Sequence, residues 1–514
     1  MDLPEIRLNI GLFLNEHDLA SCVLVNKMWY HTFLPFLYYT CDTEVSYHAQ
    51  HRTSFKNYLQ HTRDLTVSYN TLKTRKDQDL FLQECTNLRR LRLKPAHLNT
   101  KFFLKLIHQS SLLRRLDMSV GEVIQLHTTD QLTIAPSNCM VNFLETLAQS
   151  CPQLTELGLD MMLHIDSEKQ FYKSFARNFM HKLTKLEWVW FRSSQVDILP
   201  WITRENNNDI CDAAFPELKQ LAVSICVTDM PHPWIQELVL FENCPKLEVL
   251  AWSWDPSALY GPATLDRTQD IHSFITTLCS FITNSWLKLH SISLTMTRDD
   301  HYIFEDEQVS RVLMSFRNPI RHFRLRNGNP CTKLTWQALR MHLHTIESIH
   351  ISSIYISSNT GMQLSSLEIQ EVLSSGQRLI DFRHKSVLDV MDVTNDMIPW
   401  PRSISSEFHY PWLCHRLQVL KINLMRHPHD HLLNFAVFSQ LTKLTELRVL
   451  HLTYPGNGPE YGMDPTQYLH DPTFPECPSF DGIYSSFIEI RNHPLGKRLL
   501  LIWPGLESCH WYNL

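Results

Sequence analysis

Apolar residues recur along most of the chain in one short pattern: two leucine-type residues three positions apart, then a third two positions later. Leu88, Leu91 and Leu93 form the first clear copy, and later copies follow at intervals of about 25 to 40 residues. The copies begin at Leu88, Leu113, Leu154, Leu183, Leu218, Leu247, Leu289, Ile320, Ile346, Leu379, Leu417 and Leu447. Because strand side chains alternate between two faces, each copy predicts a strand with one apolar face. A dozen copies in series predict stacked repeats.

Short helices are expected between these strands. The segments 143–152 and 234–245 each predict a helix that a Cys-Pro pair ends, directly before a strand. We expect Leu65 with Val67 to precede the series, and a copy that begins at Leu506 to close it. Over about residues 58 to 514 the series resembles leucine-rich repeats of the Cys-Pro-bearing kind. The resemblance implies a curved solenoid with a parallel concave sheet.

The first forty residues have a different, helical pattern. Pro4 and Glu5 suit the first turn of a helix. Asp18 and Asn26 are expected to cap a second and a third helix, and Pro35 to mark the end of the third. About twenty residues of this stretch are apolar, more than a three-helix unit can bury in a core of its own. The surplus must pack on the rest of the chain or in a groove of a partner protein.

Residues in this stretch resemble the F-box pattern, which opens on Leu-Pro with a nearby Glu, continues to Asp-Leu and ends on Lys/Arg-x-Trp. The matching residues are Leu3, Pro4, Glu5, Ile6, Ile10, Leu14, Asp18, Leu19, Val25, Lys27 and Trp29. Two departures are the missing residue between Pro4 and Glu5, and Asn26 where Cys is frequent. The resemblance implies docking on the adaptor Skp1, and through it on cullin and RING subunits. The residues it assigns to Skp1 binding are Leu3, Pro4, Ile6, Leu8, Ile10, Leu14, Leu19, Val25 and Trp29.

The expected fold class is therefore α/β, with two parts. Residues 1–45 are expected to form a three-helix F-box domain, and residues 46–514 an irregular leucine-rich-repeat solenoid. The polar segment 39–52 should be the joint between them. The Pro- and Gly-rich segment 454–482 is the largest insertion, and we interpret it as a loop, with a lid over one rim as the alternative.

Charge and cysteine content narrow the function class. Lys and Arg number 47 against 53 Asp and Glu, a net charge of −6, which argues against nucleic acid or an anionic membrane as the main partner. The 13 scattered cysteines and the absence of a secretory signal pattern indicate a reduced intracellular protein, cytoplasmic or nuclear. No apolar run approaches the roughly twenty residues that a membrane span needs.

Motifs of catalysis and metal binding are missing from the sequence. None of the usual phosphate-loop, zinc-protease or hydrolase signatures occurs, so we expect no enzyme activity and no cofactor. Cys414-His415 and Cys509-His510 lack the companions of a tetrahedral zinc site, and the histidine cluster 427–431 is expected to be a solvated turn. The pairs Trp188/Trp190 and Trp252/Trp254 are expected to fill layers of the solenoid, although the outer member of each pair could reach the concave face.

The residues between the repeat leucines should form the open face, and their charges are uneven. Two basic patches flank a middle rich in Ser and Thr. The basic residues predicted to bind a target are Arg90, Arg92, Lys94, Arg115, Arg324, Arg326, Arg383 and Lys385. Two such patches suit a target with acidic or phosphorylated ends, because Arg pairs carboxylate or phosphate in a bidentate fork. A solvated polar face is the alternative.

The leading prediction is a non-catalytic substrate receptor of an SCF-type (Skp1–cullin–F-box) ubiquitin ligase, in which the F-box binds Skp1 and the solenoid presents a target. The alternative is an interaction scaffold that uses its F-box without ubiquitin transfer.

Overall fold

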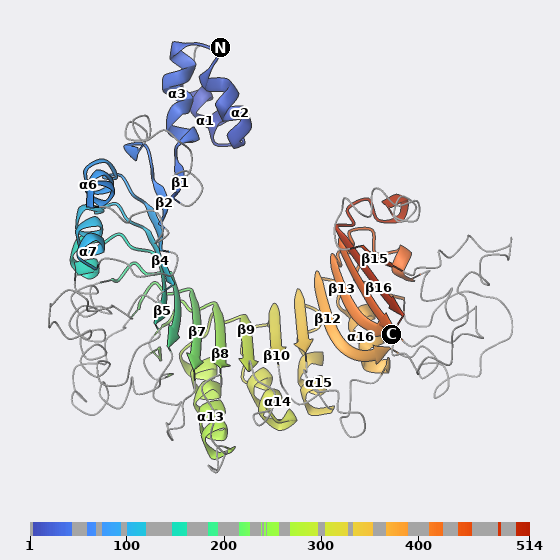
Figure 1. Ribbon diagram of the computed structural model, residues 1–514. Helices are drawn as coiled ribbons and strands as arrows, with labels where there is room; N and C mark the ends of the chain where they lie inside the picture. The colour runs from blue at the N-terminus through green and yellow to red at the C-terminus, as the bar shows by residue number, and fades with distance from the viewer. Residues whose placement is uncertain are drawn as a thin grey trace, which may run out of the picture. The chain divides into compact units, whose positions relative to one another are not determined.

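The computed structural model has an α/β fold built from short parallel strands with helices between them (Figure 1). The structure describes residues 4–43, 59–67, 75–93, 100–119, 146–161, 183–193, 215–226, 238, 241–242, 244–255, 268–296, 304–326, 333–352, 366–388, 411–424, 440–454, 482–484 and 500–513. The chain divides into two compact units. Unit 1 comprises Met1–Leu247 with Trp254–Leu265, and unit 2 comprises Glu248–Ser253 with Asp266–Leu514.

Unit 1 begins with three helices, α1 (Pro4–Gly11), α2 (Glu16–Val23) and α3 (Lys27–Leu37). Asn26 caps α3 as expected, since its Oδ1 accepts a hydrogen bond from Trp29 N at 2.9 Å. The cap assigned to Asp18 is wrong. Asn15 begins α2, its Oδ1 accepts from Asp18 N at 2.9 Å, and its Nδ2 donates to the Asp18 carboxylate at 2.7 Å.

Pro35 does not end α3, which continues to Leu37. A proline in the last turn removes one hydrogen bond and leaves few later turns to distort. The core of the three helices forms around Phe33, which is fully buried and lies 5.3 Å from the Trp29 ring, centroid to centroid. Gly11 lets α1 approach α3, because a Cβ there would lie 2.8 Å from the Phe36 ring.

The strands of unit 1 are paired in chain order, and all the pairs are parallel. They are β1 (Thr40–Asp42), β2 (Asp64–Val67), β3 (Arg90–Leu93), β4 (Arg115–Ser119), β5 (Glu156–Met161), β6 (Trp188–Ser193) and β7 (Gln220–Cys226). Helices α6 (Arg75–Glu84) and α7 (Thr100–Gln109) lie along one side of them (Figure 1). The sequence placed a joint at 39–52, but β1 already pairs with β2, so the sheet begins directly after α3.

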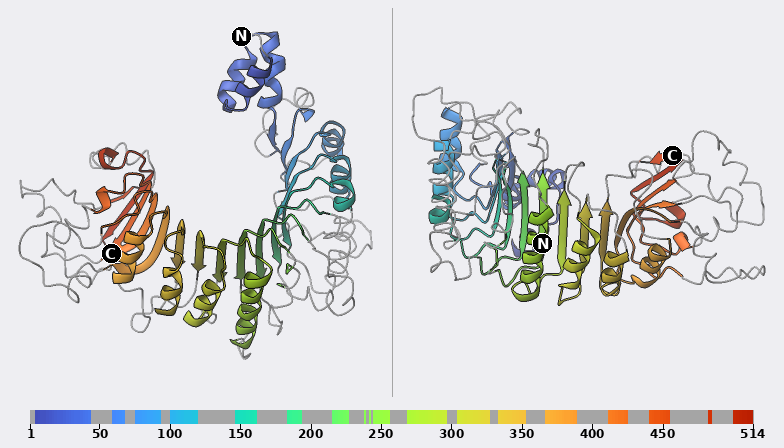
Figure 2. Two further views of the ribbon diagram at one scale, coloured as in Figure 1. Left: turned by 180° about the vertical axis from the view of Figure 1, so that it is seen from behind. Right: turned by 90° about the horizontal axis from the view of Figure 1, so that it is seen from below.

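The strands of unit 2 continue the same design, with β15 as the exception. They are β8 (Val249–Asp255, mostly in unit 2), β9 (Ser291–Met296), β10 (His322–Arg326), β11 (Ser348–Ser352), β12 (Asp381–Leu388), β13 (Val419–Leu424), β14 (Val449–Tyr454), β15 (Gly482–Tyr484) and β16 (Ser508–Asn513). Strands β9 to β14 pair in parallel and in chain order, β16 follows β14, and β15 adds to β16 in the antiparallel sense. Helices α13 (Thr268–Asn284), α14 (Asp306–Met314), α15 (Lys333–Arg340) and α16 (Ser366–Ser375) connect the strands, and α13 to α15 lie on one side of β9 to β11 (Figures 1 and 2).

One backbone hydrogen-bond arrangement repeats along the sheet of each unit. A single carbonyl oxygen just before a strand accepts from two successive N–H groups of the next repeat; Arg63 O, for example, accepts from Arg89 N at 2.7 Å and from Arg90 N at 2.9 Å. Arg321 O does the same in unit 2 for Glu347 N and Ser348 N, at 2.7 and 2.9 Å. This regularity and the parallel register make the fold a leucine-rich-repeat-like solenoid.

The core contains most of the apolar positions that the sequence pattern identified, together with helix residues such as Leu106 and Phe274. Trp188, the third position of the copy that begins at Leu183, is not part of it. Leu88, Leu91 and Leu93 are all 1 % exposed or less. The copies expected at the two ends of the series are confirmed too, since Leu65 and Leu506 are buried. Indole N–H groups link neighbouring repeats of unit 2. Trp336 Nε1 donates to Glu371 at 3.3 Å, Trp412 Nε1 to Gln370 Oε1 at 2.7 Å, and Trp503 Nε1 to Leu441 O at 3.2 Å. Among the described residues, no helix is both long enough and apolar enough to span a bilayer.

Acid should destabilise unit 2. His384 is buried, and burial lowers its pKa from 6.5 to about 4. The unfolded chain therefore binds a proton between pH 6.5 and 4 that the folded chain does not, and the free energy of unfolding falls as pH falls through that window, by up to about 1.4 kcal/mol per pH unit. Urea denaturation of His384→Gln should show a shallower loss of stability from pH 7 to 5 than the wild type. Equal slopes would contradict this.

Candidate functional site

Apolar side chains of α1–α3 and of the turns between them are exposed, and we term this set of residues the helical apolar surface. Its members are Ile6, Leu8, Ile10, Leu12, Phe13, Leu24, Val25, Met28 and Tyr30. The most exposed are Phe13 at 88 %, Leu24 at 84 % and Leu12 at 70 %. Leaving this much apolar area in contact with water is unfavourable, and patches of this kind mark sites of protein association.

The residues predicted to bind Skp1 fall into three groups. Ile6, Leu8, Ile10 and Val25 lie on the helical apolar surface, whereas Leu14 and Trp29 are half-buried and Leu19 is buried beneath it at 6 % exposure. Pro4 is the first residue of α1, and Leu3 lies outside the described residues. The sequence-based prediction omitted Leu12, Phe13 and Leu24, which belong to the turns after α1 and α2. The available signal was their apolar type shortly before Asn15 and Asn26, the residues that cap α2 and α3.

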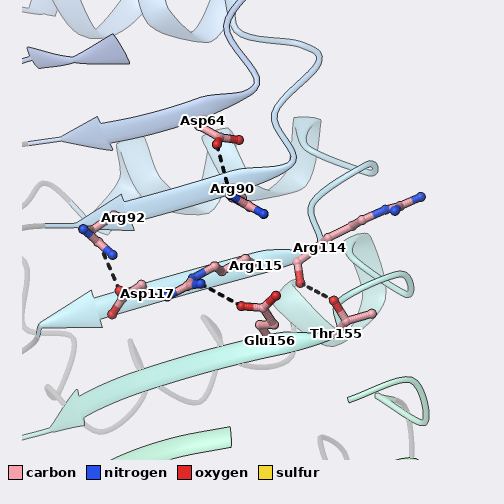
Figure 3. A network of polar contacts seen from close by, with 8 residues as sticks. All are labelled: Asp64, Arg90, Arg92, Arg114, Arg115, Asp117, Thr155 and Glu156. Atoms are coloured by element: carbon pink, nitrogen blue, oxygen red, sulfur yellow. Dashed lines mark hydrogen bonds and ion pairs between the residues drawn. The ribbon is translucent and has the colours of Figure 1, made fainter. Parts of the chain in front are cut away.

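On the open face of unit 1, the predicted basic residues are paired with carboxylates. Figure 3 shows Arg90 against Asp64, Arg92 against Asp117, and Arg115 against Glu156, with nitrogen–oxygen distances of 3.4, 3.1 and 2.9 Å. The register explains the pairing, because Arg92 lies opposite Asp117 and Arg115 opposite Glu156 on adjacent strands. Three guanidinium groups thus meet three carboxylates, and this patch retains little free positive charge.

Trp188 and Trp190 also lie on this open face, not between layers as the sequence suggested. Both are half-exposed, while Val189 between them is buried at 5 % exposure. The Arg115 guanidinium carbon lies 5.6 Å from the centre of the Trp188 ring. In contrast, Trp252 is buried at 1 % exposure, as expected for a residue that fills a layer. Trp188 and Trp190 occupy outward positions of β6, whereas Trp252 occupies an inward position of β8.

The open face of unit 2 carries a row of basic side chains at one register position. Arg324 of β10 lies opposite His350 of β11, His350 opposite Arg383 of β12, and Arg383 opposite Lys421 of β13. We term these four residues the cationic row. Its carboxylate neighbour is Asp381, which accepts from Arg383 Nε at 2.8 Å and from Arg383 Nη2 at 2.7 Å. The sequence-based prediction of target-binding residues included Arg324 and Arg383 but neither His350 nor Lys421.

The groups of the cationic row repel one another. Partial burial, followed by the charges of Arg324, Arg383 and Lys421, lowers the pKa of His350 from 6.5 to about 4. Burial and the charges of Arg326 and Arg383 lower the pKa of Arg324, and burial with the charge of Arg383 lowers that of Lys421. The row is therefore a region of positive potential in which His350 is neutral at pH 7.

Two predicted target-binding residues have no described side chain. Lys94 lies outside the described residues, and Lys385 lies within β12 at a position whose side chain is not described. Arg326 is exposed at the end of β10. The histidine cluster 427–431 and residues 455–481 of the large insertion also lie outside the described residues.

The described cysteines have the character of core residues. Cys414 and Cys509 are fully buried, and burial raises the pKa of each thiol to about 12, so neither is a thiolate ready to bind a metal. The described residues contain no group of three or more His, Cys, Asp or Glu side chains placed to hold a metal ion.

The sequence matches no protein-family model, and it has no match among curated proteins. Its fold has some likeness to a solved structure described as "Crystal structure of Rad7 and Elc1 complex in yeast". The sequence identity is 13 % and the TM-score 0.35, over 87 % of this chain and 92 % of that chain.

Proposed function

We propose that this protein is the substrate-recognition subunit of an SCF-type ubiquitin ligase. In this proposal the helical apolar surface binds Skp1, and through it cullin and RING subunits, while the open face of the repeats binds a target protein. The chain has no catalytic role of its own. It raises the rate of ubiquitin transfer by holding the target near the ligase.

The observation that carries the proposal is the helical apolar surface. The three helices and the turns between them leave Leu8, Leu12 and Phe13 exposed, although Phe33 and Leu19 already fill the core of the helices. A partner with an apolar groove would remove this area from water, at a gain of about 25 cal/mol per Å². The F-box resemblance of the same stretch of chain, from Pro4 to Trp29, supports Skp1 as that partner.

The test is reconstitution from purified components. The full chain, Skp1, cullin and RING subunit should co-elute as one complex in size-exclusion chromatography, and cells depleted of the chain should degrade at least one bound protein more slowly. A chain that binds Skp1 but changes no half-life would be a scaffold, and a chain that does not bind Skp1 would contradict the proposal.

A further inference from the structure

The cationic row of unit 2 holds more positive charge than the neighbouring carboxylates neutralise. Arg324, Arg383 and Lys421 contribute three cations, and Asp381 is the carboxylate that acts on all three. Within the described part of the chain, neither Arg324 nor Lys421 has a side-chain hydrogen bond or ion pair. About two positive charges are left over. The arginines of unit 1, which each have a carboxylate opposite, show that this excess is not general to the open face.

The strand register sets the size of the charged region. Neighbouring strands lie about 4.8 Å apart, so Arg324 and Arg383 flank His350 on either side at roughly 10 Å between backbones, and Lys421 lies one strand further. Arginine and lysine side chains are long enough to converge on one small group above His350. Phe323 and Phe382, which are buried under the row, fix the backbone that carries the two arginines.

We propose that the cationic row binds a phosphomonoester dianion, presented by a phosphorylated serine or threonine of the target protein. This rests on the proposed function only in naming the target as the carrier of the phosphate. A phosphomonoester brings a charge of about −1.5 to −2 and three acceptor oxygens, which matches the excess charge of the row and the unpaired donors of Arg324 and Lys421. A carboxylate brings half of that charge.

The site is too small to favour nucleic acid. The unpaired cations span four strands, roughly 14 Å of backbone, whereas duplex binding typically engages six to ten phosphates. The chain as a whole is acidic, with a net charge of −6. One or two phosphates on a protein segment fit these dimensions and this charge better.

The experiment measures binding of N-acetyl-phosphoserine methylamide to the full chain by isothermal titration calorimetry, without any adaptor. Arg324→Gln and Lys421→Gln should each weaken binding about tenfold. The matched control is Arg92→Gln, which removes an arginine from the equivalent strand position but one already paired with Asp117; binding should stay within about twofold. Each variant should still bind Skp1, so failure here is separable from failure of the proposed function.

Comparison probes identify the source of the phosphate. N-acetyl-glutamate methylamide should bind at least tenfold more weakly than the phosphoserine probe. Tighter binding of inorganic phosphate, or of a 12-nucleotide single-stranded RNA that Arg324→Gln abolishes, would overturn the assignment to a phosphorylated protein. Equal binding of the phosphoserine probe by wild type and Arg324→Gln would overturn the site itself.

The pKa of His350 provides a second measurement, which an anion bound elsewhere on the chain would leave unchanged. The groups that face His350 are Arg324 of β10, Arg383 and Asp381 of β12 and Lys421 of β13. Burial and the three cations lower the pKa of His350 to about 4, and the charge of Asp381 opposes them. A dianion seated among these groups should raise that pKa, which nuclear magnetic resonance of the imidazole can follow, with His350→Gln to assign the signal. No rise at saturating phosphoserine probe would place the anion elsewhere.

Discussion

Leu8→Asp combined with Phe13→Asp is expected to weaken binding of Skp1 by at least about thirtyfold. Leu8 and Phe13 are 48 % and 88 % exposed, so a charge at either position leaves the helical core intact. In an apolar interface each charge would be desolvated without a partner, and truncation of an interface anchor alone typically costs about 2 kcal/mol. Titration calorimetry with purified Skp1 measures the loss, and circular dichroism checks that the helices remain folded.

The matched control is Leu501→Asp, which charges an equally exposed leucine, at 84 %, far along the chain in unit 2. It should bind Skp1 like the wild type. A folded Leu8→Asp/Phe13→Asp protein with unchanged affinity would show that the helical apolar surface is not the docking site.

Trp412→Ala is expected to destabilise unit 2 by about 3–5 kcal/mol. Trp412 is 1 % exposed, its indole N–H donates to Gln370 Oε1 at 2.7 Å, and its backbone N–H donates to Gln440 Oε1 at 3.1 Å. The substitution opens a cavity and leaves the buried Gln370 oxygen without this donor, and both effects lower the free energy of unfolding. Urea denaturation followed by circular dichroism measures the change.

Trp188→Ala is the matched comparison, because Trp188 is half-exposed on the open face and contacts Arg115 through its ring. We expect a loss of no more than about 1 kcal/mol. If both substitutions lowered the free energy of unfolding by the same amount, the assignment of Trp412 to the core and of Trp188 to the open face would be wrong.

The repeat architecture could be predicted because it depends on a local rule. Each strand buries its alternate residues, so positions such as Leu91 and Leu325 identify their strands without knowledge of distant contacts. The copy that begins at Leu183 makes Trp188 its third apolar position, and this prediction is wrong. Val189 lies opposite Leu157 on the adjacent strand, so the buried positions of this repeat are Leu186 and Val189, and Trp188 lies outside. Leu183 is buried as well, and its spacing from Leu186 concealed the true register in the sequence.

The sequence alone could not predict which charged residues form ion pairs, because the pairing depends on which strands are neighbours and on their register. Arg92 and Arg324 occupy equivalent positions in sequence, yet Arg92 lies opposite Asp117 and Arg324 opposite His350. A long insertion separates Arg383 from Lys421, and only the parallel register brings them side by side. In the same way, Asn15 rather than Asp18 caps α2 because side-chain capping depends on where the preceding turn ends.

The most direct test of the central claim, that the helices are an adaptor-docking module, is hydrogen–deuterium exchange of the full chain with and without purified Skp1. We predict that Skp1 slows exchange in residues 4–37, most strongly around Leu8 to Phe13, and leaves exchange in strands β9 to β14 unchanged. Unchanged exchange in residues 4–37 at saturating Skp1, or protection confined to the repeats, would contradict it.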